Sequence, residues 1–308
     1  MTTARLGVGF GPGTLGFPPG DVLVRFGELA EEIGFEHFWA NDHLSWAHPL
    51  VDPMVLLSSV AARTTRIGLA TGVYLLPLRS PASTARAFAS LDYISGGRAI
   101  LGVGVGGEFV EDFSAAGISA DRRGRRADAA IQLLHRLWSG EPVDYRDEFF
   151  DFENVQVLPR PIQRDIPIIA GGRSEAALQR AATLADGWMP YLMSPDRIRD
   201  GVERLRELSG HRNHRVIAHV FAYFGPDRAR ARQDAIDYLS AQYQRDMART
   251  VDRCVPYGPA EAVADDLRTF DLTGVTDIVL RPLSEPKNLL RALEDDAGAV
   301  RRFWVERT

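Results

Sequence analysis

The feature of this chain that most restricts its fold is a regular alternation of short apolar segments with longer amphipathic segments. The short segments are rich in β-branched residues, which is typical of strands, and the longer ones carry apolar residues at the i, i+3 and i+4 spacing of helices. We predict eight strands, at residues 6–10, 37–41, 67–76, 98–106, 166–172, 187–193, 216–224 and 277–282. We predict helices between them, including 22–34, 53–65, 82–95 and 174–187. Strict alternation implies parallel strands, because each return needs a helical crossover.

Eight such units in 308 residues match an α/β (β/α)8 fold, the TIM barrel, better than two doubly wound domains. No Pro-, Gly- or Ser-rich linker divides the chain, so we expect residues 1–308 to form one domain. A long segment, about 108–165, separates predicted strands four and five and contains a helical pattern at 121–138. We expect this segment to be an insertion that walls the active site.

Composition narrows the classes of partner. The formal net charge is −5 with acids and bases interspersed, which gives no basic field for nucleic acid. No window approaches the roughly 18 apolar residues of a membrane helix, and the first residues lack a signal-peptide pattern, so we expect a cytoplasmic protein with small-molecule partners. The single cysteine, Cys254, forms no internal disulfide, and the single lysine, Lys287, argues against a Schiff-base mechanism.

Histidine spacing gives little support for a metal site, and we predict none. His211 and His214 lie in a polar turn, and His43 and His48 flank an apolar bend without the spacing of a metalloprotease. No GxSxG motif of the serine hydrolases is present.

The polar triplet Asn41, Asp42 and His43 directly follows a predicted strand. In a barrel the carboxyl ends of the strands meet at one mouth, so Asp42 and His43 are candidates for catalysis and Asn41 is a candidate for binding a cofactor. An imidazole beside the Asp42 carboxylate can hold a proton near neutral pH and exchange it with a substrate. The alternative is that Asn41 or Asp42 ties down a loop and His43 fills the barrel top.

Small residues dominate the other predicted strand ends. Glycines there let a flat ligand approach the backbone closely. The candidates are Gly72 and Val73 after strand three, Gly104, Gly106 and Gly107 after strand four, and Gly171, Gly172, Arg173 and Ser174 after strand five. At 171–174 two glycines precede a helix start, where free N–H groups, the helix dipole and the Ser174 hydroxyl suit a phosphate. The alternative is that Ser174 simply caps its own helix.

A dinucleotide-binding domain is a rival interpretation, because Gly102, Gly104 and Gly107 have GxGxxG spacing after a strand. That motif needs a helix immediately afterwards and an acidic residue ending a second strand about 20 residues on. Here a long arginine-rich helical pattern, 121–138, stands in that region, which argues against this interpretation.

Six blocks of the sequence are specific when taken together in this order: NDHL at 41–44, TTRIGLATGVYLLPLRSP at 64–81, LDYISGGRAILGVGVGG at 91–107, RGRRADAAIQLLHRLW at 123–138, IPIIAGGRSEAALQRAATLADGW at 166–188 and YGPAEAVADDLRTFDLTGVTDIVLRP at 257–282. They resemble the luciferase-like monooxygenase family of flavin and deazaflavin oxidoreductases. The resemblance implies a (β/α)8 barrel that binds FMN or coenzyme F-420 (F420, 8-hydroxy-5-deazaflavin) at its mouth. One departure is that Gly107 leads to Glu108 and Phe109, where the family often has a tryptophan.

Carried onto this sequence, the resemblance implies roles for individual residues. Gly171, Gly172 and Ser174 would receive the cofactor phosphate. His43 would face the ring or the substrate, and Gly72 and Val73 match a bulge, often a non-prolyl cis peptide, that backs the ring. Homodimers are common in the family.

Three functions follow from this resemblance. The leading hypothesis is hydride transfer between F420 and a small organic substrate, with His43 as proton donor or acceptor. The alternatives are a monooxygenase that uses reduced FMN and oxygen, and a non-catalytic flavin-binding barrel. A cofactor-free phosphosugar lyase on the same barrel is disfavoured, because the sequence has no internal lysine that could form a Schiff base.

Overall fold

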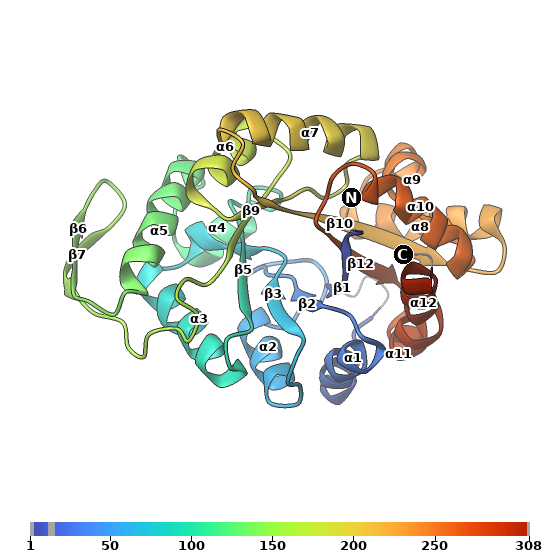
Figure 1. Ribbon diagram of the computed structural model, residues 1–308, viewed down its shortest axis with the longest axis horizontal. Coiled ribbons are helices and arrows are strands. Elements are labelled where there is room, and N and C mark those ends of the chain that lie inside the picture. Colours follow the sequence, from blue (N-terminus) through green and yellow to red (C-terminus); the bar gives the residue numbers. More distant parts are fainter. Residues whose placement is uncertain (1–2, 12–15, 307–308) are drawn as a thin grey trace.

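Eight parallel strands close into a barrel in the computed structural model, which describes residues 3–11 and 16–306 (Figure 1). The barrel strands are β1 (Arg5–Phe10), β2 (His37–Ala40), β3 (Gly68–Thr71), β5 (Ala99–Gly104), β8 (Ile168–Gly171), β9 (Gly187–Met189), β10 (Arg215–Phe224) and β12 (Asp277–Leu283). Their order around the ring is β1-β2-β3-β5-β8-β9-β10-β12, and β12 pairs with β1 to close it. The predicted (β/α)8 barrel is confirmed.

Helices surround the barrel (Figure 1). They are α1 (Gly20–Ile33), α2 (Pro53–Ala61), α3 (Pro81–Ser95), α4 (Glu111–Ala116), α5 (Arg123–Leu137), α6 (Glu175–Leu184), α7 (Pro195–Leu208), α8 (Arg228–Tyr243), α9 (Ala248–Cys254), α10 (Ala260–Asp271), α11 (Leu289–Arg291) and α12 (Gly298–Glu306). Local signals start and end them. Asp52 caps α2 by accepting from the N–H groups of Met54 and Val55, and Gly96 ends α3 at φ +70°.

Short elements complete the structure. They are the strands β4 (Tyr74–Leu75), β6 (Val143–Arg146), β7 (Asp151–Val155) and β11 (Tyr257–Gly258), the 3-10 helices η1 (Leu76–Leu78) and η2 (Pro286–Asn288), and the π-helix η3 (Ala292–Ala297). The third predicted strand, 67–76, is wrong as one continuous element. It is broken between β3 and β4 at a cis peptide bond that joins Gly72 to Val73.

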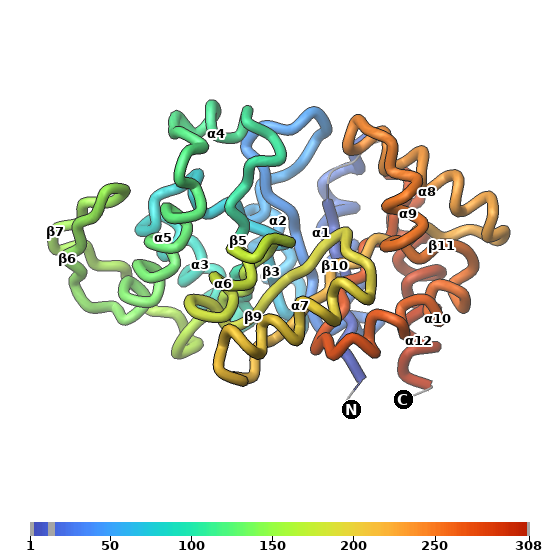
Figure 2. The backbone as a smooth tube through the Cα atoms, turned by 90° about the horizontal axis from the view of Figure 1, so that it is seen from above, coloured from blue at the N-terminus to red at the C-terminus, as the bar shows by residue number. Residues whose placement is uncertain are grey.

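The segment between β5 and β8 differs from the predicted insertion at 108–165. Its long helix α5 packs against α3 and α6, so α5 belongs to the ring of barrel helices. The antiparallel hairpin β6–β7 lies on the outside of the molecule (Figure 2). Of this segment, α4 and the loops that flank it reach the barrel mouth, where Phe113 packs against Leu75 and Leu78. The wall that we expected from the whole segment is therefore limited to these parts and to the first residues of α5, Arg123 and Gly124.

A polar network ties the strands together at the amino end of the barrel. His37 Nε2 lies 2.9 Å from a carboxylate oxygen of buried Asp277, and Trp39 Nε1 donates to His37 Nδ1 at 2.8 Å. Arg5 and Arg215 also bond to Asp277, so this carboxylate links β1, β2, β10 and β12. Above the network, Trp39, Ile100, Ile169, Ile217 and Val279 fill the barrel interior. The opposite, carboxyl end is left for a ligand site.

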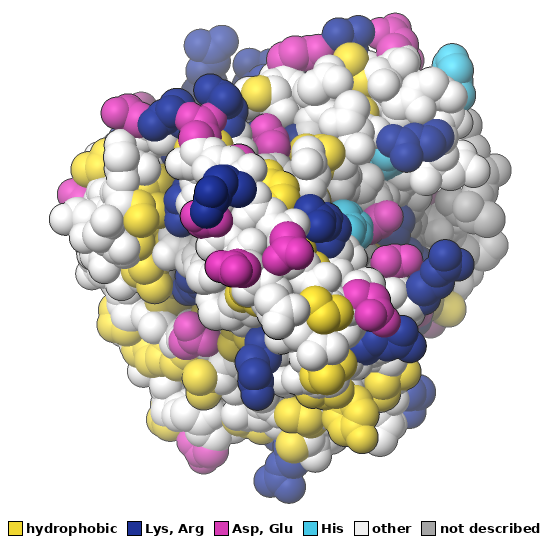
Figure 3. All heavy atoms as spheres, turned by 90° about the vertical axis from the view of Figure 1, so that its left-hand side faces the viewer, with side chains coloured by type: hydrophobic (Ala, Val, Ile, Leu, Met, Phe, Trp, Pro, Cys, Tyr) yellow, Lys and Arg dark blue, Asp and Glu magenta, His cyan; other side chains and the backbone are white. Residues whose placement is uncertain are grey.

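The surface on the side of α5 and the hairpin carries mixed charges. In Figure 3 basic and acidic side chains alternate across this face, with apolar side chains between them. This pattern gives no large field of one sign on this face. Within residues 3–11 and 16–306, no helix is both long and apolar enough to cross a membrane.

Candidate active site at the carboxyl end of the barrel

A cavity of about 710 Å³ opens at the carboxyl ends of the strands. Every predicted site residue lines it: Asn41, Asp42, His43, Gly72, Val73, Gly104, Gly106, Gly107, Gly171, Gly172, Arg173 and Ser174. These residues follow four different strands, and the closed barrel brings them together. Their individual roles are set by the contacts described next.

Asp42 is not the acidic partner of His43 that the sequence led us to expect. The Asp42 side chain is buried and accepts two hydrogen bonds from Arg79, at 2.6 and 2.8 Å. It also accepts from the N–H of Leu75 at 2.9 Å. Through these hydrogen bonds Asp42 links the end of β2 to β4, by way of Leu75, and to Arg79 in the segment that follows. This is the loop-tying alternative that the sequence left open.

Asp112, from α4, is the carboxylate that contacts His43. Its Oδ2 lies 2.7 Å from Nδ1 of His43, and its Oδ1 accepts from the N–H groups of Leu44 and Ser45 at 2.7 and 2.9 Å. Burial raises the pKa of Asp112, but the hydrogen bonds from His43 and the two backbone groups outweigh it and hold the pKa below its ordinary value. Asp112 is therefore ionised at neutral pH and fixes the orientation of the imidazole.

Aromatic rings enclose His43 on two sides. The ring of Trp46 lies 4.1 Å from the imidazole in an edge-to-face arrangement, and the ring of Phe109 lies 5.5 Å away. Within residues 3–11 and 16–306, Nε2 of His43 has no hydrogen-bond partner, and the residue lines the cavity. Phe109 thus supplies an aromatic wall close to the position where the family often has tryptophan. The arrangement presents one imidazole nitrogen to a ligand and keeps water from its sides.

The floor of the cavity is built around Val73. A Cβ atom at Gly104 would lie 2.5 Å from Val73 Cγ2, and a Cβ atom at Gly171 would lie 2.7 Å from Val73 Cγ1. No side chain fits at either position, so the two glycines form the socket that holds Val73. Asn41 supports the same region, because its amide nitrogen can donate to the carbonyls of Phe10 and Gly72 at 3.1 and 3.3 Å. The floor is therefore flat, apolar and closely supported.

The start of α6 forms a cradle of backbone N–H groups. Ser174 caps α6 by accepting from the Ala177 N–H at 3.2 Å, which is the capping alternative that the sequence left open. The Gly172 N–H donates to the Met189 carbonyl at 3.2 Å, so it is not one of the free donors that we expected. In the described part of the chain, the N–H groups of residues 173 to 176 have no acceptor. These four donors at a helix start suit an anion.

Three arginines line the cavity near this cradle: Arg123, Arg173 and Arg180. Arg180 is buried and bonds to Asp128 at 2.5 Å, while Arg123 donates to the Gly106 carbonyl at 3.3 Å. The guanidinium of Arg173 lies 4.8 Å from the Tyr191 ring centroid. The three guanidinium groups thus add positive charge on the side of the cavity that holds the N–H cradle, which strengthens an anion site.

Gly106 and Gly107 shape the loop after β5. Their φ angles are +66° and +102°, a backbone region that favours glycine. A Cβ atom at Gly107 would also collide with the guanidinium of Arg123, at 2.7 Å from its Nε. The next residue, Glu108, accepts from the Tyr191 hydroxyl at 3.4 Å, so this loop meets the loop after β9 across the mouth.

The polar residues of this cavity or its first contacts that sequence reasoning missed include Asp112, Arg123, Arg180 and His219. Asp112 and Arg123 lie in the segment that we treated as an insertion. Arg180 could have been found, because it lies one helical turn beyond Ala176 and Ala177 and so shares the face of the cradle. His219 could also have been found, since it lies two residues before Phe221 and both side chains are therefore on the same face of β10.

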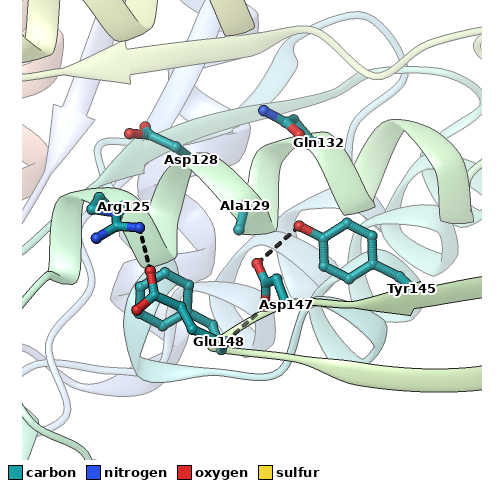
Figure 4. A pocket seen from close by; sticks show the side chains of 8 residues that line it. Arg125, Asp128, Ala129, Gln132, Tyr145, Asp147 and Glu148 are labelled. Atoms are coloured by element: carbon teal, nitrogen blue, oxygen red, sulfur yellow. Dashed lines mark hydrogen bonds and ion pairs between the residues drawn. The ribbon is translucent and has the colours of Figure 1, made fainter.

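A second hollow, of about 500 Å³, lies between α5 and the hairpin β6–β7 (Figure 4). Most of its charged groups bond to neighbours. Arg125 pairs with Glu148 at 2.5 Å, and Tyr145 donates to Asp147 at 2.9 Å (Figure 4). The Arg125–Glu148 pair holds the hairpin against α5, the Tyr145–Asp147 bond fixes its turn, and we assign the hollow a structural role.

Comparisons with known proteins agree with this architecture. The profile of the luciferase-like monooxygenase family matches residues 1–277. An uncharacterised protein of Mycobacterium tuberculosis is 38% identical over 53% of this chain and 56% of its own length, so the chain spans little more than half of that relative. An F420-dependent glucose-6-phosphate dehydrogenase of Nakamurella multipartita is 32% identical over 76% of this chain and 72% of its own.

A solved structure shares the fold. An F420-dependent secondary alcohol dehydrogenase in complex with an F420-acetone adduct superposes with a TM-score of 0.84, covers 97% of this chain and 99% of its own, and is 16% identical. At that identity the likeness concerns the fold alone. Together with the profile match over residues 1–277, these findings show that the chain belongs to the luciferase-like monooxygenase family.

Proposed function

We propose that this protein is an F420-dependent oxidoreductase that transfers hydride between the coenzyme and a small organic substrate. The observation that carries the proposal is that one cavity holds both an anion cradle at the start of α6 and an imidazole oriented by a buried carboxylate. The F420-dependent relative of Nakamurella supports the choice of coenzyme.

The described residues fit a phosphorylated ring cofactor at two points. The N–H groups of residues 173 to 176, with Arg173 and Arg180, would hold the phosphate. Val73, held between Gly104 and Gly171, would lie against the ring. Neither glycine has a side chain that could stand between the ring and Val73. When bound, F420 supplies the carbon centre that accepts or gives hydride.

His43 would move the proton that accompanies hydride transfer. Asp112 bonds to Nδ1 and leaves Nε2 to face the ligand. In the oxidation of an alcohol, His43 Nε2 would take the hydroxyl proton as the carbonyl product forms, and bound F420 would supply the hydride acceptor. The reverse reaction returns the same proton. Trp46 and Phe109 exclude water from the imidazole during the transfer.

The second candidate is a monooxygenase that uses reduced FMN and oxygen. The same cradle would accept the FMN phosphate, and the family to which the chain belongs is named for this chemistry. The third candidate, a non-catalytic flavin-binding barrel, is disfavoured by the His43–Asp112 pair, since a structural barrel does not need an oriented imidazole facing its cavity.

Cofactor titration followed by turnover separates these candidates. The wild-type protein should bind oxidised F420 and reduce it with at least one member of a panel of small alcohols and sugar phosphates. His43→Ala should bind F420 and lose little in melting temperature but lose turnover by about 100-fold or more, because a general acid or base contributes that factor. Oxygen-dependent turnover with reduced FMN, without F420 binding, would establish the second candidate instead. Cofactor binding without turnover of any substrate would favour the third.

A further inference from the structure

Three histidines point into the barrel or its mouth, and two of them have clear protein partners. His37, at the amino end, is bonded through both ring nitrogens, to Trp39 and Asp277. His43 is bonded to Asp112 through Nδ1. The third, His219, lies on β10 and lines the ligand cavity while being only 8% exposed.

The imidazole of His219 has no such partner in the described part of the chain. Within residues 3–11 and 16–306, neither of its ring nitrogens forms a hydrogen bond, although its backbone N–H donates to the Pro190 carbonyl at 2.9 Å. Its ring lies near that of Phe221, with centroids 5.2 Å apart. Because His219 lines the cavity, its two ring nitrogens are available there to a ligand that offers a matching donor or acceptor.

The charge state of His219 defines what it can recognise. Burial, and then the positive charge of Arg281, lower the pKa of His219 to about 3. The imidazole is therefore neutral at neutral pH. A neutral imidazole offers one N–H donor and one nitrogen acceptor, which suits an uncharged polar group better than a phosphate or carboxylate.

His219 is also the polar point of an otherwise apolar floor. Val73 and Met189 provide the neighbouring surface, and both pack in the cluster that fills the barrel interior. The nitrogen of the Asn41 amide can donate to the carbonyls of Phe10 and Gly72. Deazaflavin and flavin rings both carry carbonyl and N–H groups at one end of an otherwise apolar ring system, and these are the uncharged polar groups that a neutral imidazole can hydrogen-bond.

We propose that His219 is a cofactor-binding residue that hydrogen-bonds a carbonyl or N–H group of the bound ring system from the wall formed by β10. The inference rests on the proposed function, since it assumes a ring cofactor in this cavity. It assigns His219 to the ring, as distinct from the phosphate that the cradle at residues 173 to 176 would hold.

Equilibrium titration with oxidised F420 and with FMN tests this role. His219→Leu, which removes both hydrogen-bonding atoms, should weaken binding of the cofactor that the wild type prefers by about tenfold, the value of one hydrogen bond of typical strength. His219→Gln retains a donor and an acceptor and should stay within about threefold of the wild type. His135→Leu, at an exposed position on α5, is the matched control and should bind as the wild type does.

A measurement on the wild type guards against a variant that fails to fold. The ring nitrogen signals of His219, assigned by comparing histidine-labelled wild type with His219→Gln, should shift when the cofactor saturates the protein. Unchanged signals, or His219→Leu affinity equal to that of the wild type, would overturn the inference while leaving the proposed function intact. A wild type that binds neither F420 nor FMN would overturn the proposed function, and this inference with it.

Discussion

At the scale of residues, the side chains proposed from the sequence line one cavity, but the predicted partner of His43 was wrong. The triplet at 41–43 does lie at the cavity. The sequence paired His43 with its neighbour Asp42, yet the structure pairs it with Asp112, which is 69 residues away. Adjacent side chains in an extended segment diverge, so Asp42 turns toward Arg79 instead. A partner that arrives from another element cannot be found without the fold.

Substitution of Asp112 tests whether it orients His43. Asp112→Asn keeps the shape of the side chain but removes its charge, so we expect kcat to fall by roughly tenfold or more while KM changes little. In the wild type the ionised pair is lost as the pH falls through the lowered pKa of Asp112, so the acidic limb of the pH profile that this loss produces should be absent from Asp112→Asn. Because the pKa of Asp112 lies below its ordinary value, the wild-type pair should persist down through pH 5.

The pH profile of steady-state turnover checks this expectation. Asp42→Asn serves as the comparison, since Asp42 bonds to Arg79 and Leu75 rather than to His43. It should lower the melting temperature and leave the position of the acidic limb unchanged. An Asp112→Asn enzyme with wild-type kcat and an unmoved limb would remove Asp112 from the mechanism.

At the scale of elements, strand ends were predicted well and breaks within elements were not. From the sequence we predicted that the glycines at the ends of β5 and β8 lie at the barrel mouth, but not that they form the socket of Val73. Strand three reads as a continuous apolar run, and nothing in that pattern places the interruption between β3 and β4. The interruption follows from contacts with β5 and β8, which are elements distant in sequence.

The socket of Val73 predicts that one added methyl group, at Gly171, lowers cofactor affinity. In Gly171→Ala the new Cβ would lie 2.7 Å from Val73, so Val73 must shift into the cavity. Overpacking of this kind costs about 1–3 kcal/mol, and we expect cofactor affinity to fall by about tenfold or more. Gly20→Ala, where a Cβ meets nothing within 4 Å, should bind normally. Fluorescence titration measures both, and equal affinities would show that the floor does not depend on this socket.

At the scale of the whole molecule, the barrel was predictable because strand order around the ring follows strand order along the chain. Alternation alone therefore specified the closed sheet and the mouth where strand ends meet. The long segment between β5 and β8 was assigned wrongly in part. Its helix α5 carries an ordinary amphipathic pattern, and only packing against α3 and α6 identifies it as a barrel helix rather than an insertion.

We propose that the bare N–H groups at the start of α6 hold the phosphate of a ring cofactor in the cavity that His43 faces. A crystal structure of the protein with oxidised F420 tests this arrangement. We expect phosphate oxygens within hydrogen-bond distance of the N–H groups of residues 173 to 176, and the ring between Val73 and His43. A phosphate bound elsewhere, or a ring on the far side of the barrel from His43, would contradict it.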